Sequence, residues 1–499
     1  MYLPSSPDIL EKYLYVKSGR KSLYSLSVFT TLVLVIGMFL FISVNPYFFP
    51  YTIFALITGF YLFISYGIGI LSKDFDIKKH LSLVTKYFDR SAKEEIDILL
   101  PICREPLDVL RNTWLHVAHL RAAHEGIINV FVLDDGKEPA CETLAKVYGF
   151  HYITRETNEY KKAGNLRNAF TKTTAPFFVI FDADFCPRRD FLLETLPYMY
   201  QDEKVGIVQT VQYFEARLKE LSVVERGCAQ IQELFYRLIQ VSRNYFNGAI
   251  CVGTSAVYRR SALEKHGGTA KIGHSEDVHT SVLVMQDGGK LQYVPLILSK
   301  GICPDSWKQM FTMYYRWTTG SLTLMLNKDF WRNNMSVVQK LCFCTGFGYY
   351  VTTGLSALMA FMPSIYLLIF KPQYIFWFNI LWAIPSILLT NIYMRYWQKT
   401  GYSWDAIECR AVACYAHLFA LFDILMGKTE GWIPTGSAQK SNRFDLFKNL
   451  VFWHVLTLGV VLGGLIGYRY GSKDFINFIP LIVLYTYYVA TLRSVLMLK

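Results

Sequence analysis

The chain of 499 residues contains no Cys-x-x-Cys pair, and its ten cysteines lack the spacing of a structural metal site. We therefore expect reduced thiols that serve in packing and exclude a cysteine-based zinc site. Internal repeats and low-complexity segments are also absent, which excludes a repeat array. A cleavable signal peptide is not expected, because the first apolar run is too long and a second one follows at once.

Charged residues are scarce, at 18% of the chain, and their balance is basic, with a net charge of +12. A basic chain can bind nucleic acid, but Lys and Arg lie mostly beside the apolar runs here, in the stretches 11–21, 73–93 and 428–448. The sequence has no basic and aromatic platform of the kind that single-strand binders use. Because this charge pattern is typical of cytoplasmic loops in membrane proteins, we expect a lipid bilayer as partner and no nucleic acid.

Long apolar runs contribute much of the 52% hydrophobic content. Six of them reach the length of about 20 residues that a helix needs to cross a bilayer: 23–47, 51–72, 343–370, 374–395, 449–468 and 475–496. Glycines and Pro363 interrupt the third run, which predicts a kinked or re-entrant pair. The basic loops favour a multi-pass protein of the plasma membrane with both termini in the cytoplasm.

The region between about 75 and 335 has the pattern of a soluble α/β domain. Short apolar runs alternate with helical patterns, at 96–103, 128–134, 177–182, 205–211 and 291–298. This alternation predicts a mostly parallel sheet, in a cytoplasmic domain inserted between transmembrane helices. The expected segments are 1–74 with two spans, 75–335 with the α/β domain and an interface helix, 336–400 with spans three and four, 401–446 with an interface helix and a loop, and 447–499 with the last two spans.

Two segments, 309–327 and 404–426, predict amphipathic helices that lie in the membrane interface. In the second segment, charged residues and a histidine interrupt an apolar face. Ordinary surface helices of the soluble domain are the alternative interpretation.

Acidic motifs follow two of the predicted strands. Asp134 and Asp135 end the strand at 128–134, and Asp182 and Asp184 follow the strand at 177–182. Ligands of open α/β sheets bind at the carboxyl ends of the strands, and side chains two residues apart in an extended chain point to the same side. Asp182 and Asp184 can therefore grip one hard cation whose other ligands come from a pyrophosphate. A single Asp-x-Asp is more often a solvated turn, but two acidic motifs at successive strand ends favour the metal.

A third acidic motif is Ser275-Glu276-Asp277, at the start of an apolar helical run. A carboxylate there can act as general base on an acceptor hydroxyl. A helix N-cap formed by Ser275 or Asp277 is an equally good local interpretation, and both can hold at once. Between the acidic motifs, Arg155 and Lys162 flank a small-residue turn and suit diphosphate binding.

Taken in order, these motifs resemble those of the processive family 2 glycosyltransferases. The order is Asp-Asp-Gly at 134–136, Lys-Ala-Gly-Asn at 162–165, Asp-x-Asp at 182–184, Gly-Thr-Ser-Ala at 253–256, Ser-Glu-Asp at 275–277 and Arg-Trp at 316–317. The family includes cellulose synthase, other β-glucan synthases, hyaluronan synthase and chitin synthase. The likeness covers about 95–320 together with the flanking spans, and the Trp-x-Pro-Thr segment at 432–435 is most similar to cellulose synthases of bacteria.

The resemblance implies a GT-A-type fold for the α/β domain and a role for each motif. Glu105, Asp134, Asp135, Arg155 and Lys162 would bind the nucleotide sugar, Asp182 and Asp184 would hold Mg²⁺ or Mn²⁺, and Asp277 would be the base. Gly253, Thr254, Ser255, Glu276, Arg316 and Trp317 would line the acceptor site, and Trp432 and Thr435 would belong to a gating loop. Trp317 would stack on the acceptor sugar, because the axial C–H face of a sugar ring is apolar.

The chain departs from the family pattern at several positions. Met313 replaces the Gln of the family's Gln-x-x-Arg-Trp motif, and Ser275 replaces the Thr of its Thr-Glu-Asp motif. Cys103 replaces an aromatic residue that in the family is a partner of the nucleotide's base. The gating motif lacks its Lys, for which Lys440 is a substitute. These departures bear on the identity of the sugar and of the linkage more than on the type of reaction. The chain stops after the sixth expected span, so we expect neither the cyclic-di-GMP-binding domain of many bacterial cellulose synthases nor direct activation by that nucleotide.

The expected reaction is a single displacement that inverts the sugar configuration and is repeated on a growing polysaccharide. The resemblance implies UDP-glucose as donor, a β-glucan such as cellulose as product, and threading of the polymer through the spans. It also allows an export or accessory subunit as partner. The alternative is non-processive transfer of one sugar to a lipid acceptor such as polyprenyl or dolichyl phosphate. A pure channel or transporter is a third interpretation, which the acidic motifs disfavour.

Overall fold

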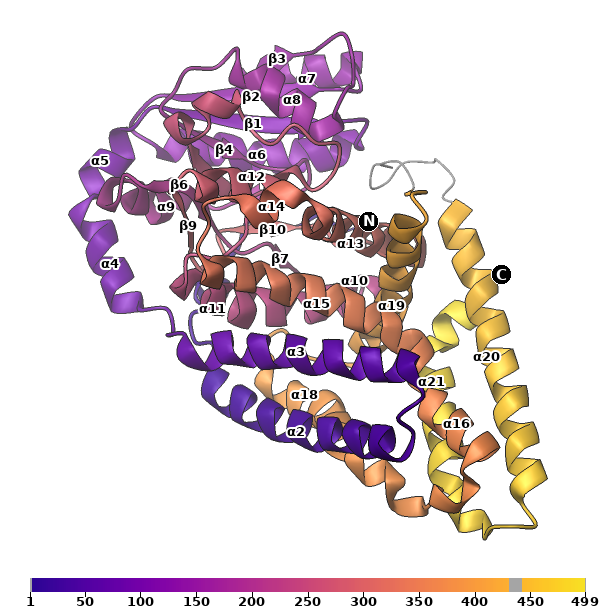
Figure 1. Ribbon diagram of the computed structural model, residues 1–499. Coiled ribbons are helices and arrows are strands. Elements are labelled where there is room, and N and C mark those ends of the chain that lie inside the picture. The colour runs from indigo at the N-terminus through magenta and orange to yellow at the C-terminus, as the bar shows by residue number, and fades with distance from the viewer. Residues whose placement is uncertain (1, 430–441, 499) are drawn as a thin grey trace.

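The computed structural model describes residues 2–429 and 442–498. An α/β domain forms the upper part of the molecule in Figure 1, and long helices form the lower part. Trp432 and Thr435, predicted for the gating loop, lie outside the described residues.

The central sheet has seven strands in the order β3-β2-β1-β4-β8-β6-β9. Their bounds are β1 Ile96–Ile102, β2 Ile128–Asp134, β3 His151–Ile153, β4 Phe177–Ile180, β6 Val205–Gln209, β8 Ala256–Arg259 and β9 Lys290–Tyr293. Only β8 runs antiparallel to its neighbours, β4 and β6, while the other pairs are parallel. The prediction of an α/β domain with a mostly parallel sheet is confirmed.

Helices cover both faces of the sheet, as the apolar strands require. In β1, Ile98 and Leu100 belong to the core formed with helices α6 (Leu107–Ala123) and α9 (Phe191–Gln201). Leu99 points to the opposite face, because side chains alternate along a strand. There it packs in the core that contains residues of α8 (Lys161–Phe170) and α12 (Glu276–Gln286).

The segment before the first span belongs to the α/β domain, although the sequence places it with the spans. It carries the short helix α1 (Ile9–Lys12). Lys12 Nζ lies 2.5 Å from Glu194 Oε1 and 2.8 Å from Asp190 Oδ2, and the Ile297 N–H donates to the Lys12 carbonyl at 3.0 Å. The segment also lies beside a small second sheet of β5 (Cys186–Pro187), β10 (Ser299–Gly301) and β7 (Tyr213–Phe214).

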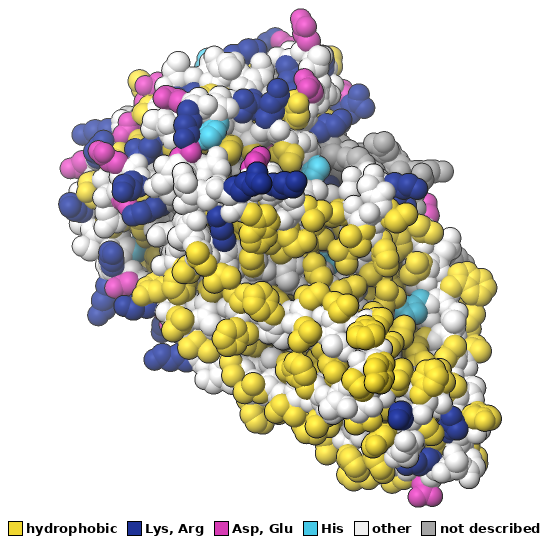
Figure 2. Space-filling view, viewed as in Figure 1, with side chains coloured by type: hydrophobic (Ala, Val, Ile, Leu, Met, Phe, Trp, Pro, Cys, Tyr) yellow, Lys and Arg dark blue, Asp and Glu magenta, His cyan; other side chains and the backbone are white. Residues whose placement is uncertain are grey.

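Five helical stretches in the described residues are long and apolar enough to cross a membrane, which makes the chain a multi-pass membrane protein. They are α2 (Arg20–Val44), α3 (Phe49–Leu71), α15 and α16 together (Val337–Phe370), α20 (Asn442–Arg469) and α21 (Ile479–Leu496). α15 (Val337–Met359) ends before α16 (Met362–Phe370) begins, so the third run is broken close to Pro363, as predicted. Figure 2 shows hydrophobic side chains gathered over these helices and charged ones over the α/β domain.

The fourth predicted span, 374–395, is not one helix. It consists of a 3₁₀ segment (Trp377–Trp382), α17 (Ile384–Leu388), a π-helical turn (Leu389–Tyr393) and α18 (Met394–Trp397). Pro385 lies in the first turn of α17, where a proline is tolerated but cannot continue a preceding helix. The broken segment runs beside α2 in Figure 1, and the Ser386 hydroxyl donates to the Thr30 carbonyl at 3.3 Å.

Both predicted interface helices form, as α13 (Trp307–Leu326) and α19 (Trp404–Leu425). Their placement in the membrane interface stays a prediction. α19 packs against α10 (Val223–Leu234), α13 and α15. Most of its side chains are buried, and small residues allow the close approach. A Cβ on Gly227 of α10 would lie only 2.4 Å from the Cys409 sulfur of α19.

Candidate active site

The Asp-Asp-Gly turn lies at the end of β2, and its first carboxylate accepts three hydrogen bonds from within the protein. Asp134 accepts hydrogen bonds from the N–H of Gly136 at 2.6 Å, from the N–H of Glu138 at 2.9 Å and from the Tyr152 hydroxyl at 2.7 Å. The side chain is buried. Asp134 therefore shapes the turn, and a contact with a nucleotide stays a prediction.

Asp135 forms a bidentate ion pair with Arg155. Arg155 Nε and Nη2 each lie 2.7 Å from a carboxylate oxygen of Asp135. The same guanidinium donates to the carbonyls of Glu159 and Lys161, also at 2.7 Å. Arg155 thus holds the turn before α8 in place, which is a positioning task that the sequence motif does not reveal.

The turn before α8 also explains the glycine of the Lys-Ala-Gly-Asn motif. A Cβ on Gly164 would lie 2.0 Å from the Glu159 carbonyl oxygen and 2.3 Å from Arg155 Nη1. No side chain fits there without moving the backbone of the turn. Gly164 therefore lets α8 begin close to Arg155, which orients the neighbouring Lys162 toward the next motif.

Lys162 joins four of the motifs. Its Nζ donates to Asp182 Oδ1 at 2.5 Å and to the Gly253 carbonyl at 2.9 Å, and it lies 3.8 Å from Glu276 Oε1. The Lys-Ala-Gly-Asn, Asp-x-Asp, Gly-Thr-Ser and Ser-Glu-Asp segments therefore meet at one ammonium group. The sequence predicts each motif separately, and the structure brings them together.

Asp182 and Asp184 carry the predicted metal site. Burial and the neighbouring Asp182 raise the pKa of Asp184 to about 7. Burial also raises the pKa of Glu105, whose carboxylate accepts from the Cys103 N–H at 2.5 Å. Among the described residues, no group of three or more His, Cys, Asp or Glu side chains forms a metal site. Two carboxylates fit a Mg²⁺-like cation that completes its shell with phosphate oxygens and water.

Asp277 lies at the start of α12. The Ser275 side chain makes no capping hydrogen bond, while Asp277 Oδ1 accepts from the Val278 N–H at 2.8 Å. A Cβ on Gly253 would lie 2.9 Å from Asp277 Oδ2, so glycine leaves this carboxylate room. Burial and then the Glu276 charge raise the pKa of Asp277 to about 7, against the opposing effect of Lys162. Near neutral pH this group can accept a proton.

The Gly-Thr-Ser segment is buried beneath the acidic residues and is hydrogen-bonded to Asp182. The Thr254 hydroxyl accepts from the Asp182 N–H at 2.9 Å, and the Ser255 and Ser299 hydroxyls are hydrogen-bonded to each other. Both Thr254 and Ser255 are buried. Gln209 of β6 fixes the segment by donating to the Thr254 carbonyl at 2.9 Å. The sequence offered no signal for Gln209, because it belongs to no motif.

Arg316 and Trp317 lie on α13. Burial lowers the pKa of Arg316, while the negative charges of Glu276, Asp182 and Asp277 act in the opposite direction, so the guanidinium lies close to the acidic site. Trp317 is partly buried and meets the Tyr314 ring edge to face, with centroids 5.1 Å apart. Tyr314 in turn contacts the ring of His417 on α19 at 5.9 Å. α13 therefore connects the acidic site to the helical part of the molecule.

A further contact fixes α12 against α13. A Cβ on Gly320 of α13 would lie 1.8 Å from the Ser275 hydroxyl oxygen. Ser275 itself has a left-handed backbone, with φ of 52°. The start of α12, which carries Glu276 and Asp277, is therefore seated directly on the helix that carries Trp317.

Acidic residues at the strand ends thus surround one lysine at the edge of a mostly parallel sheet. The family model described as "Glycosyl transferase family 2" matches residues 97–267. Residues 97–267, within the α/β domain, thus carry the sequence pattern of family 2 glycosyltransferases.

Curated relatives include cellulose synthases. "Cellulose synthase 1" of Komagataeibacter xylinus is 30% identical over 302 residues, covering 59% of this chain and 19% of that protein. "Cellulose synthase 1 catalytic subunit [UDP-forming]" of the same organism is 26% identical over 394 residues, covering 74% of this chain and 51% of that protein. The matches thus span between about a fifth and a half of these relatives.

Among solved structures, the mannosyltransferase PcManGT from Pyrobaculum calidifontis in complex with GDP-Man and Mn²⁺ is 16% identical, with a TM-score of 0.49. The match covers 69% of this chain and 96% of that chain.

Proposed function

We propose that this chain is a processive, inverting hexosyltransferase that transfers glucose from UDP-glucose to the end of a growing β-glucan such as cellulose. Its α/β domain would lie in the cytoplasm, and the polymer would cross the plasma membrane through the helical part. The main support for this proposal is that the Lys162 ammonium group contacts residues of three other motifs. Helix α13, which carries Arg316 and Trp317, extends from this site to the membrane helices. The relatives' names, cellulose synthase and "UDP-forming", support the proposed product and donor.

In the donor half of the site, Lys162 would place its positive charge beside the diphosphate. Its position against Asp182 and the Gly253 carbonyl fixes the ammonium group at the strand ends. Asp182 and Asp184 would hold Mg²⁺ or Mn²⁺, which when bound neutralises charge on the departing nucleotide. The Arg155–Asp135 pair would keep the turn at Lys162 in its binding position.

In the acceptor half, Asp277 would take the proton from the attacking hydroxyl. The acceptor oxygen then forms a bond to the anomeric carbon while the bond from that carbon to UDP breaks. Attack from the side opposite UDP inverts the configuration in one displacement. A carboxylate whose pKa lies at about 7 is matched to this task at neutral pH.

The experiment that tests this function supplies several labelled UDP-sugars to membranes containing the chain. A long polymer that linkage-specific hydrolases degrade is the expected product. A single sugar attached to a polyprenyl or dolichyl phosphate would instead establish the non-processive alternative. Absence of any sugar-nucleotide turnover by folded protein would contradict both enzymes.

Trp317→Ala is expected to reduce polymer synthesis on the order of tenfold or more, because the acceptor loses its stacking platform. Trp317→Phe should retain part of the activity, and UDP affinity should barely change in either variant. Trp331→Ala is the matched control, since Trp331 is exposed on α14 (Lys328–Arg332). Product length and UDP affinity are measured on equal amounts of folded enzyme. Polymer of normal length from Trp317→Ala would make Trp317 a membrane anchor only.

A further inference from the structure

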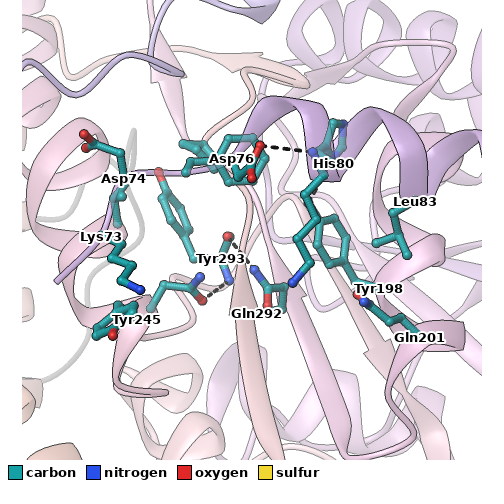
Figure 3. Close-up of a pocket in the computed structure, with 15 residues that line it drawn as sticks. Lys73, Asp74, Asp76, His80, Leu83, Tyr198, Gln201, Tyr245, Gln292 and Tyr293 are labelled. Carbon is teal, nitrogen blue, oxygen red and sulfur yellow. Dashed lines mark hydrogen bonds between the residues drawn. The ribbon is translucent and has the colours of Figure 1, made fainter.

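A cavity of about 300 Å³ lies where the chain leaves α3 and enters the α/β domain (Figure 3). One side is formed by residues 73–76 and by helix α4 (Ile77–Lys86). The other side is formed by residues of α9, α11 (Gln240–Tyr245) and β9. None of the acidic motifs lines it, so the cavity is separate from the transferase site.

Two lysines line the cavity together with two aspartates. Lys73 and Lys79 line it, and both side chains are exposed. Within residues 2–429 and 442–498, neither ammonium group forms an ion pair, and Lys73 Nζ lies 5.8 Å from the ring centroid of Tyr245. In Figure 3 the Lys73 side chain extends toward Tyr245 at the rim.

The two carboxylates that line the cavity are already engaged elsewhere. Asp74 accepts a hydrogen bond from the Ser18 hydroxyl and lies 3.5 Å from Arg20 Nε. Asp76 caps α4, with Oδ1 3.0 Å from the Lys78 N–H nitrogen and 3.1 Å from that of Lys79. Neither carboxylate forms an ion pair with Lys73 or Lys79, so both ammonium groups can donate hydrogen bonds to an anion.

The inner wall is polar but uncharged where it faces the lysines. Gln292 and Asn244 are tied to Tyr293, through the Tyr293 carbonyl at 3.0 Å and the Tyr293 N–H at 2.7 Å. Gln201 lines the cavity from the end of α9. Amide groups in these positions can donate hydrogen bonds to ester oxygens or hydroxyl groups of a ligand.

The cavity lies level with the ends of two membrane helices. α3 ends at Leu71, two residues before Lys73, and the guanidinium of Arg20, at the start of α2, donates to the Ser72 hydroxyl at 2.7 Å. Ile70 and Leu71 are 57% and 70% exposed, so an apolar surface adjoins the cavity on the membrane side. Lysines close to the ends of membrane helices attract anionic headgroups.

We propose that this cavity binds the phosphate headgroup of an anionic phospholipid, with Lys73 and Lys79 on the phosphate and the acyl chains beside Ile70 and Leu71. The shared chemistry is a phosphate ester, and the membrane rather than the solution is its source. A lipid bound there contacts both the exit of α3 and the α/β domain, and so holds the domain at a fixed height above the membrane. The proposal does not depend on the proposed function.

The test reconstitutes the full chain into phosphatidylcholine vesicles that contain spin-labelled phosphatidylglycerol or spin-labelled phosphatidylcholine. The expected result is a larger immobilised fraction for phosphatidylglycerol. Lys73→Gln with Lys79→Gln should reduce this preference by about fivefold for each lysine removed. Gln201→Trp, which fills the cavity without changing its charge, should reduce the preference as well.

Lys78→Gln with Lys86→Gln is the matched control, because both residues belong to α4 and neither lines the cavity. An equal loss in the control pair, or a wild-type preference in Gln201→Trp, would overturn the proposal. Calorimetry of the protein in neutral detergent with inorganic phosphate forms the second arm. Lysine-dependent phosphate binding without any lipid preference would assign the cavity to a soluble phosphate and also overturn the lipid site.

Discussion

Asp277→Asn is expected to reduce sugar transfer by about 10²–10⁴-fold, the usual contribution of a general base, while UDP affinity stays nearly unchanged. The amide keeps the size of the side chain and can no longer take a proton. Initial rates of polymer formation and UDP binding are measured on the same preparation. Glu276→Gln is the comparison, since Glu276 lies beside Lys162 and should have the smaller effect. If Asp277→Asn kept wild-type turnover, the Asp277 carboxylate would serve only to stabilise the start of α12.

The pH dependence follows from the same carboxylate. Because the base must be deprotonated, kcat/KM of the wild type should rise with pH through about 7, where burial and Glu276 place the pKa of Asp277. The stability effect has the opposite sign. Between the ordinary value of 3.8 and about 7 the folded state binds more protons than the unfolded state, so stability falls as pH rises. Asp277→Asn removes this cost, and its Tm at pH 8 should not lie below that of the wild type.

Much of the α/β domain could be predicted because its signals are local. The apolar run that became β1 is buried along its whole length. Asp134 ends β2 and Asp182 follows β4, the two parallel strands that pair with β1 on either side. β8 was missed, although its residues 256–259 lie directly after the Gly-Thr-Ser motif. Its antiparallel pairing with β4 and β6 depends on contacts distant in sequence, which no local pattern reports.

The candidate site was predictable as a set of residue types and less so as an arrangement. The positions of Lys162 against the Gly253 carbonyl and of Gly320 against Ser275 are long-range contacts. The burial of α19 was not predictable either, because polar positions such as Glu408 suggest an exposed face. In the structure, Arg493 Nε donates to Glu408 Oε1 at 2.8 Å. This ion pair compensates the negative charge of the buried Glu408 side chain.

Loss of the predicted metal site should reduce sugar transfer about as much as loss of the base, and substitution of Asp184 tests it most directly. Asp182 is bonded to Lys162 at 2.5 Å, so replacing it would disturb the lysine as well as the metal. Asp184 forms no ion pair within the described part of the chain. Asp184→Asn keeps the size, removes the charge and should reduce transfer by about 10²–10³-fold, as loss of preorganised electrostatic stabilisation does.

EDTA should abolish wild-type transfer, and Mg²⁺ or Mn²⁺ should restore it, because two carboxylates, a diphosphate and water together suit the shell of a hard cation. Mn²⁺ binding in the presence of UDP, followed by electron paramagnetic resonance, gives a readout independent of turnover and should weaken in Asp184→Asn. Asp108→Asn is the control, since Asp108 is an exposed carboxylate in the first turn of α6. Full activity in EDTA would contradict the metal site. Reduced activity of Asp184→Asn with unchanged Mn²⁺ binding would instead give Asp184 a role in binding the sugar.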